Sequence, residues 1–146
     1  MLLQARLTFA LAIGAASGSP SEACRVFLPA AERLAFGYQR GAISAVAAVR
    51  ITKATYLGLP HGDAHPWRAE AVVERALSGS FKGTRVAFDR GHGSAACDDG
   101  HPVPRAGDRW IIYLWKPVGR DHEVWQSYPA AEALRADPRL KGILAP

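Results

Sequence analysis

Gly107-Asp108-Arg109-Trp110-Ile111-Ile112-Tyr113-Leu114-Trp115 holds the densest run of β-branched and aromatic residues in the chain, and this composition predicts a β-strand. Proline has no N–H to donate to a sheet, so Pro104 and Pro117 limit the strand on either side. Alternation puts Trp110, Ile112 and Leu114 on one face and Ile111, Tyr113 and Trp115 on the other. Both faces are apolar, which predicts a buried central strand with a helix over its outer face.

Four more segments have strand-like composition. Residues 43–51 are rich in small and β-branched residues and continue through Thr52, Ala54 and Tyr56. Residues 67–77 alternate apolar and charged side chains, which favours a strand, although their Ala, Glu and Arg content would also suit a helix. Shorter strands are expected at 85–88 and 123–128, and a loop rich in glycine and proline at 91–107.

A short helix is expected at each end of this strand series. Pro29 begins a run of helix formers that stops at Gly37, and Pro129 begins a second run that ends at Asp137-Pro138. The predicted fold is therefore all-β, a five-stranded OB-like antiparallel barrel with a short N-terminal helix and a C-terminal helix.

The first 23 residues have the order of a secretory signal peptide, with Arg6 before an apolar run and small residues after it. We therefore expect residues 24–146 to form a single domain exported to the periplasm or beyond the cell. Cleavage after Ala23 would make Cys24 the first mature residue, and cleavage near Ser17 is the alternative. No later segment has the roughly 20 apolar residues of a transmembrane helix, so we expect no membrane span.

Export affects the interpretation of the two cysteines. In an oxidising compartment Cys24 and Cys97 are expected to form a disulfide, and closing a loop of about 70 residues stabilises a fold by roughly 4 kcal/mol. Two separate thiols are the alternative. Lipid attachment to Cys24 is not expected, because Ser21 stands where a lipoprotein signal has a leucine-like residue.

The charge pattern argues against nucleic acid as a partner. The formal net charge is +5, but the basic residues are interleaved with Asp and Glu, whereas a nucleic-acid surface would gather them on one face. Loss of residues 1–23 would remove Arg6 and Glu22 together and leave this charge unchanged.

Catalytic, metal and cofactor sites are not expected. His61 and His65 lie on a Pro/Gly loop, where their spacing does not put them on one helix face as in a zinc helix. Gly91-His92-Gly93-Ser94 lacks the strand-to-helix setting of a nucleophile elbow. We interpret all the histidines, which include His101 and His122, as exposed loop residues.

Tryptophans offer possible contacts for a partner. OB barrels stack bases or sugars on surface aromatic residues, although such residues more often fill the core. Trp67, Trp115 and Trp125 are the candidates in this chain. A barrel that binds oligonucleotides or glycans is therefore the alternative function.

The spacing of the motifs resembles the netrin-like domain, the OB-type barrel also found in tissue inhibitors of metalloproteinases. The matching features cover most of the mature chain: Cys24 with Cys97, the Ala45–Val49 strand, the Leu77-Ser78-Gly79 turn, Phe81-Lys82-Gly83 and Gly107-Asp108-Arg109-Trp110. The resemblance implies a monomeric, non-catalytic domain that binds a protein or envelope partner.

Inhibitory relatives of this type chelate a protease's zinc ion through the first cysteine. The resemblance therefore adds Cys24 and Arg25 to the possible partner contacts. Val26 stands where those inhibitors have a second cysteine, so metalloprotease inhibition is the less expected activity.

The disulfide is directly testable. The exported protein should have an intact mass lower than the reduced chain by two hydrogens, and Cys97→Ser should lower its stability by roughly 2–4 kcal/mol. Recovery of both cysteines as alkylated thiols under non-reducing conditions would contradict the bridge.

Overall fold

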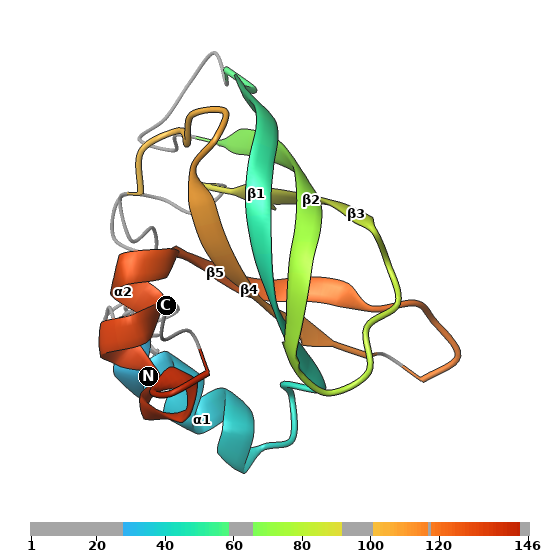
Figure 1. Ribbon diagram of the computed structural model, residues 1–146, viewed down its shortest axis with the longest axis vertical. Coiled ribbons are helices and arrows are strands. Elements are labelled where there is room, and N and C mark those ends of the chain that lie inside the picture. The colour runs from blue at the N-terminus through green and yellow to red at the C-terminus, as the bar shows by residue number, and fades with distance from the viewer. Residues whose placement is uncertain (1–27, 59–65, 92–100, 117, 144–146) are drawn as a thin grey trace, which may run out of the picture.

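Five antiparallel strands and two helices form the protein in the computed structural model, which describes residues 28–58, 66–91, 101–116 and 118–143 (Figure 1). One sheet has the order β3-β2-β1-β4-β5. The elements in chain order are α1 (Ala30–Gln39), β1 (Ala45–Tyr56), β2 (Trp67–Ser78), β3 (Arg85–Arg90), β4 (Arg109–Trp115), β5 (Glu123–Pro129), α2 (Ala130–Ala136) and a 3-10 turn, η1 (Pro138–Leu140). The mostly-β prediction with a helix at each end of the strand series is confirmed.

Strand β1 is the middle of the sheet, and β4 is an inner strand between β1 and β5. The first half of β1 pairs with β4, from Ala45 opposite Leu114 to Arg50 opposite Arg109. Its pairing with β2 contains three register shifts. Such irregularities bend a strand and increase its twist, so they curl the sheet around one of its faces. The described residues contain no ladder between β3 and β5, so the expected closed barrel is not observed as a hydrogen-bonded ring.

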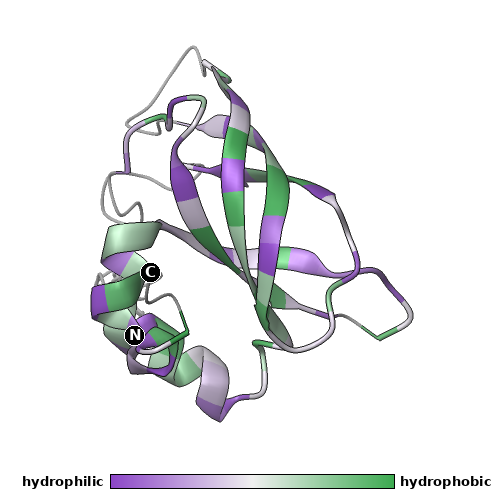
Figure 2. Ribbon diagram, viewed as in Figure 1, coloured by the Kyte–Doolittle hydropathy of each residue, from purple (hydrophilic) through white to green (hydrophobic). Residues whose placement is uncertain are grey.

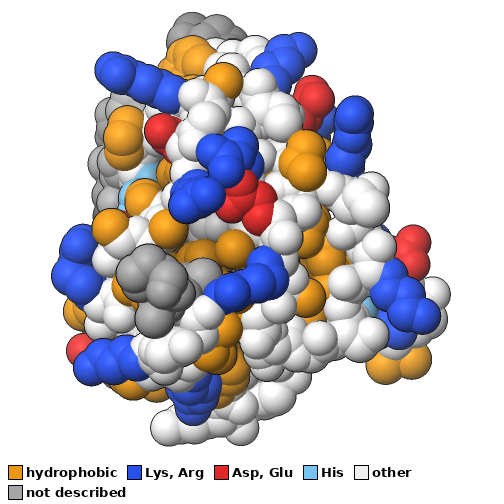
Figure 3. All heavy atoms as spheres, viewed as in Figure 1, with side chains coloured by type: hydrophobic (Ala, Val, Ile, Leu, Met, Phe, Trp, Pro, Cys, Tyr) orange, Lys and Arg blue, Asp and Glu red, His pale blue; other side chains and the backbone are white. Residues whose placement is uncertain are grey.

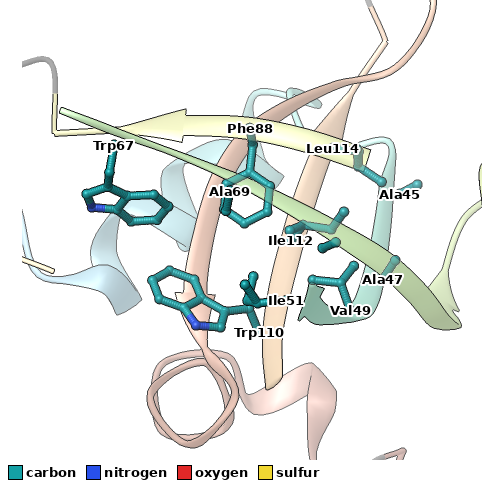
Figure 4. Packing of buried hydrophobic residues seen from close by; sticks show 11 residues of the cluster. Ala45, Ala47, Val49, Ile51, Trp67, Ala69, Phe88, Trp110, Ile112 and Leu114 are labelled. Carbon is teal, nitrogen blue, oxygen red and sulfur yellow. The ribbon is translucent and has the colours of Figure 1, made fainter. Parts of the chain in front are cut away.

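The inner face of the curled sheet holds an aromatic core. Trp67 from β2 packs edge-on against Trp110 from β4, with ring centroids 5.5 Å apart, and against Phe88 from β3 at 6.0 Å (Figure 4). Small and branched side chains of β1 and β4 fill the rest, among them Ala47, Val49, Ile51, Ile112 and Leu114. Figure 2 shows the alternation of hydrophobic and hydrophilic residues along β1 and β2 that produces this one-sided burial.

The outer face is covered by the helices over part of its area. Ile111 and Tyr113 of β4 pack there with Tyr128 of β5, beneath Leu34 of α1 and Ala133 of α2. Both faces of β4 are therefore buried, as its sequence predicts. Residues 67–77 form a strand and not the alternative helix, because Trp67, Ala69 and Ala71 all point into the inner core.

Helix α1 continues to Gln39, so the prediction that it stops at Gly37 was wrong. Gly37 lies buried inside the helix, and a Cβ there would come within 2.5 Å of the Trp125 ring. The glycine serves close packing of β5 on the helix, not helix termination.

A buried carboxylate joins the C-terminal turn to the first helix. Asp137 accepts a hydrogen bond from the Tyr38 hydroxyl at 2.8 Å and another from the backbone N–H of Arg139 at 3.0 Å. The Arg139 guanidinium lies 3.8 Å from the centre of the Tyr38 ring. The Tyr113 hydroxyl is buried nearby without a hydrogen bond to any described residue. These contacts fix η1, which the sequence pattern did not predict, against α1.

Burial beneath the helices shifts the pKa of three tyrosines. It raises the pKa of Tyr38, Tyr113 and Tyr128, and the Asp137 carboxylate raises that of Tyr38 and Tyr113 further. The folded state therefore holds these phenolic protons more tightly than the unfolded chain, where tyrosine has a pKa of about 10. The resulting stabilisation is fully present below pH about 10 and is lost as the pH rises above it.

We expect alkaline titration to unfold the protein cooperatively. The phenolate absorbance of the buried tyrosines should appear together with the loss of circular dichroism, because these hydroxyls ionise only when they are exposed. Absorbance that reaches its full amplitude while the sheet signal is intact would contradict this burial.

Candidate functional site

A groove of about 580 Å³ lies between residues 102–110 and the beginning of α2. Pro102, Val103 and Pro104 line one side, and Ala130 and Ala131 line the other. Arg105, Asp108 and Arg109 supply the polar part of its lining. An apolar lining with a few charged groups is typical of a binding site.

His101 fixes the wall of this groove. Its Nε2 lies 2.6 Å from Oε2 of Glu132, in the first turn of α2. Its backbone carbonyl accepts a hydrogen bond of 3.2 Å from the Trp67 indole. The imidazole also packs edge-on between Trp110 and Tyr128, with centroids 5.8 Å away from each. The residues that line the groove are therefore attached at His101 to both the inner core and α2.

Hydrogen-bonding chemistry sets the arrangement of protons on this imidazole. A carboxylate only accepts hydrogen bonds, so Nε2 carries a hydrogen and donates it to Glu132. On the other side of the ring, Nη2 of Arg90 lies 3.5 Å from Nδ1. Both ring nitrogens have partners, so His101 could accept a substrate proton or bind a metal only by breaking one of these contacts.

Arg90 also connects the two edge strands. It donates from Nη1 to the backbone carbonyl of Ser127, and it lies 3.3 Å from the Ser127 Oγ. Its guanidinium carbon lies 5.4 Å from the centre of the Tyr128 ring. A side chain of β3 thus makes the contact to β5 that a backbone ladder would make in a closed sheet.

Three arginines and a valine form a row across the part of the outer face that the helices leave uncovered. The pairing registers align Arg85 of β3, Val72 of β2, Arg50 of β1 and Arg109 of β4. Glu74 bridges two of them, through an ion pair with Arg50 and a contact of 3.2 Å with Arg109. Figure 3 shows lysine and arginine side chains spread over the visible face, with fewer acidic side chains between them.

The tryptophans predicted as partner contacts have different positions. Trp67 is 1% exposed in the inner core, so it has no surface to offer, and the expectation of a surface role for it is corrected. Trp125 is partly buried against α1, whereas Trp115 is 38% exposed at the end of β4. Cys24, Arg25 and Cys97 lie outside the described residues, as does the signal segment, and their roles stay predictions.

The histidines also differ from the prediction. His101 and His122 are both partly buried, so the interpretation of these two as exposed loop residues was wrong. His61, His65 and His92 lie outside the described residues. No group of three His, Cys, Asp or Glu side chains is placed to hold a metal ion in the described part of the chain. None of its helices is both long and apolar enough to cross a membrane.

Comparison with known protein families, with curated proteins and with solved structures finds no match for this chain.

The contact between His101 and Glu132 predicts a measurable loss. Glu132→Ala leaves the Nε2 proton of a partly buried imidazole unpaired, so we expect about 1–2 kcal/mol of lost stability and faster amide exchange at Val103, Arg105 and Ala106. Glu32→Ala, the same substitution in the first turn of α1, is the control and should change little. Equal effects of the two substitutions would show that His101 does not hold the groove wall.

Proposed function

We propose that this protein is an exported, netrin-like binding domain with an OB-like curled sheet, and that its groove takes an extended segment of a protein partner. The proposal rests on one observation, the groove of about 580 Å³ between residues 102–110 and α2, with its apolar lining and its two arginines. In this proposal the domain binds and carries out no chemistry.

Contacts at both ends of β3 and β5 support the OB-like interpretation. Near their beginnings, Phe81 packs edge-on against His122 with centroids 5.7 Å apart. At their ends, Arg90 bonds to Ser127. The two edge strands therefore run side by side in the same direction, and the sheet is curled nearly to closure. Five strands in this order curled into a barrel are the architecture that the OB-like prediction describes.

The groove's lining indicates the chemistry of the partner. Proline, valine and alanine offer apolar surface without competing hydrogen bonds, so they suit apolar side chains. Arg105 and Arg109 can each donate several hydrogen bonds to a carboxylate, and Arg109 already forms an ion pair with the carboxylate of Glu74. A short extended segment with apolar residues next to Asp or Glu fits both features.

Binding of oligonucleotides or glycans has less support. Stacking requires aromatic faces at the surface, and Trp67, Trp110 and Phe88 are packed on one another in the inner core. The row of arginines contains Val72 and no aromatic ring. Metalloprotease inhibition depends on Cys24 and Arg25, which lie outside the described residues.

Site-specific photocrosslinking tests the proposal. A photoreactive amino acid replaces Val103 in the groove or, as a control, Val72 on the open sheet face; both valines are 38% exposed. In the native envelope, the Val103 variant should give a discrete protein adduct that the Val72 variant lacks. Arg105→Glu in the Val103 variant should weaken the adduct, because it repels an acidic segment.

Two outcomes would overturn the proposed function. One is the same adduct from Val103 and Val72, which would place the partner elsewhere. The other is turnover of a substrate by the purified protein that is lost on replacing a residue of the groove, which would make the groove an active site.

A further inference from the structure

We propose that the hairpin between β4 and β5 docks on an anionic phospholipid membrane surface. This hairpin extends away from the helices and projects from the body of the molecule, at the right of Figures 1 and 3. The inference goes beyond the proposed function, because it concerns a different surface and a different kind of partner. The groove beside α2 contributes no residue to it.

Apolar side chains are exposed on this hairpin. Val118 is fully exposed, and Trp115 at the end of β4 is 38% exposed. Single exposed apolar residues are common on protein surfaces. Here a tryptophan and a valine lie on the same projecting hairpin, and tryptophan favours the membrane interface because its ring is apolar and its N–H is polar.

The neighbouring loop holds the base of the hairpin in place. Phe81, between β2 and β3, makes an edge-on contact with His122, just before β5. The two loops therefore lie side by side at one end of the sheet. Lys82, which follows Phe81 in this loop, is exposed. A surface made of two adjoining loops can meet a flat membrane at several points.

Charge favours an anionic surface over a neutral one. The two loops at this end carry three cations, Lys82, Lys116 and Arg120, and two anions, Asp121 and Glu123. Glu123 is paired with Arg120 at 2.8 Å, which compensates one of these anions within the hairpin. The positive charge in excess attracts anionic lipid, and the attraction must weaken as salt screens it.

A hollow on the hairpin offers a place for a lipid headgroup. Lys116, Gly119, Arg120, Asp121 and Glu123 line an open space of about 650 Å³. Lys116 and Arg120 are the groups that bind phosphate. With Val118 in the acyl boundary, these cations would lie at the depth of the phosphates, as in other proteins that bind the membrane interface.

Vesicle binding by the mature protein tests the inference. We expect co-sedimentation with vesicles of phosphatidylcholine that contain phosphatidylglycerol, weaker binding in high salt, and little binding to phosphatidylcholine alone. Val118→Asp should reduce the affinity at least about tenfold, because it removes apolar burial and adds a repelled charge. Because Val118 is fully exposed, this variant should fold normally. Val72→Asp, with the same change on the open sheet face, should bind like the wild type.

A second measurement reports on the hairpin itself. Lipids brominated in their acyl chains should quench part of the tryptophan fluorescence, and Trp115→Phe should abolish that quenching. Absence of binding to the anionic vesicles would overturn the inference. Equal losses of binding in the Val118 and Val72 variants would overturn it as well. None of these results bears on crosslinking at Val103, so the two proposals fail separately.

Discussion

Burial of both faces of β4 is the constraint on which the rest of the structure depends. A strand without a polar face needs two cores, and the protein builds one on each side. The inner core requires the sheet to curl until Trp67, Phe88 and Trp110 meet, while the outer core requires α1 and α2 to lie over Ile111 and Tyr113. The curl brings the edge strands together, and the placement of α2 puts Glu132 within reach of His101. The position of the groove therefore follows from the burial of both faces of β4.

The hydrogen bonds of His101 fix the loop that forms one wall of the groove. Residues after 101 belong to a loop rich in proline, which has few backbone N–H groups with which to hold itself to a sheet. Side chains from other elements hold the loop instead, because Glu132 bonds to the imidazole of His101 and Trp67 bonds to its backbone. The groove is consequently as rigid as the core residues that hold it, which lowers the entropy lost when a partner segment binds.

Local sequence patterns predicted the elements, because each strand's alternation and each proline-led helix is encoded within a few residues. They could not predict the site. His101 has its partners 11 and 31 residues away, so nothing beside it in the sequence distinguishes it from an exposed loop histidine. Gly37 has the same ambiguity: a glycine after a helical run usually ends a helix, and only the position of Trp125 explains why this one does not. The alternation of residues 67–77 does predict the face of the strand on which Trp67 lies. Whether that face is buried depends on the curl of the whole sheet, which no local pattern encodes.

The contact of Arg90 with Ser127 has a consequence for how the domain opens. Between β3 and β5, side chains make the connection that a full ladder of backbone hydrogen bonds makes between the other neighbouring strands. Separating β3 from β5 breaks fewer backbone hydrogen bonds than separating any two strands that are paired in the sheet. Local unfolding should therefore begin between these two edge strands. The short edge strand β3 is then the part that a protease or a second unfolding chain would reach first.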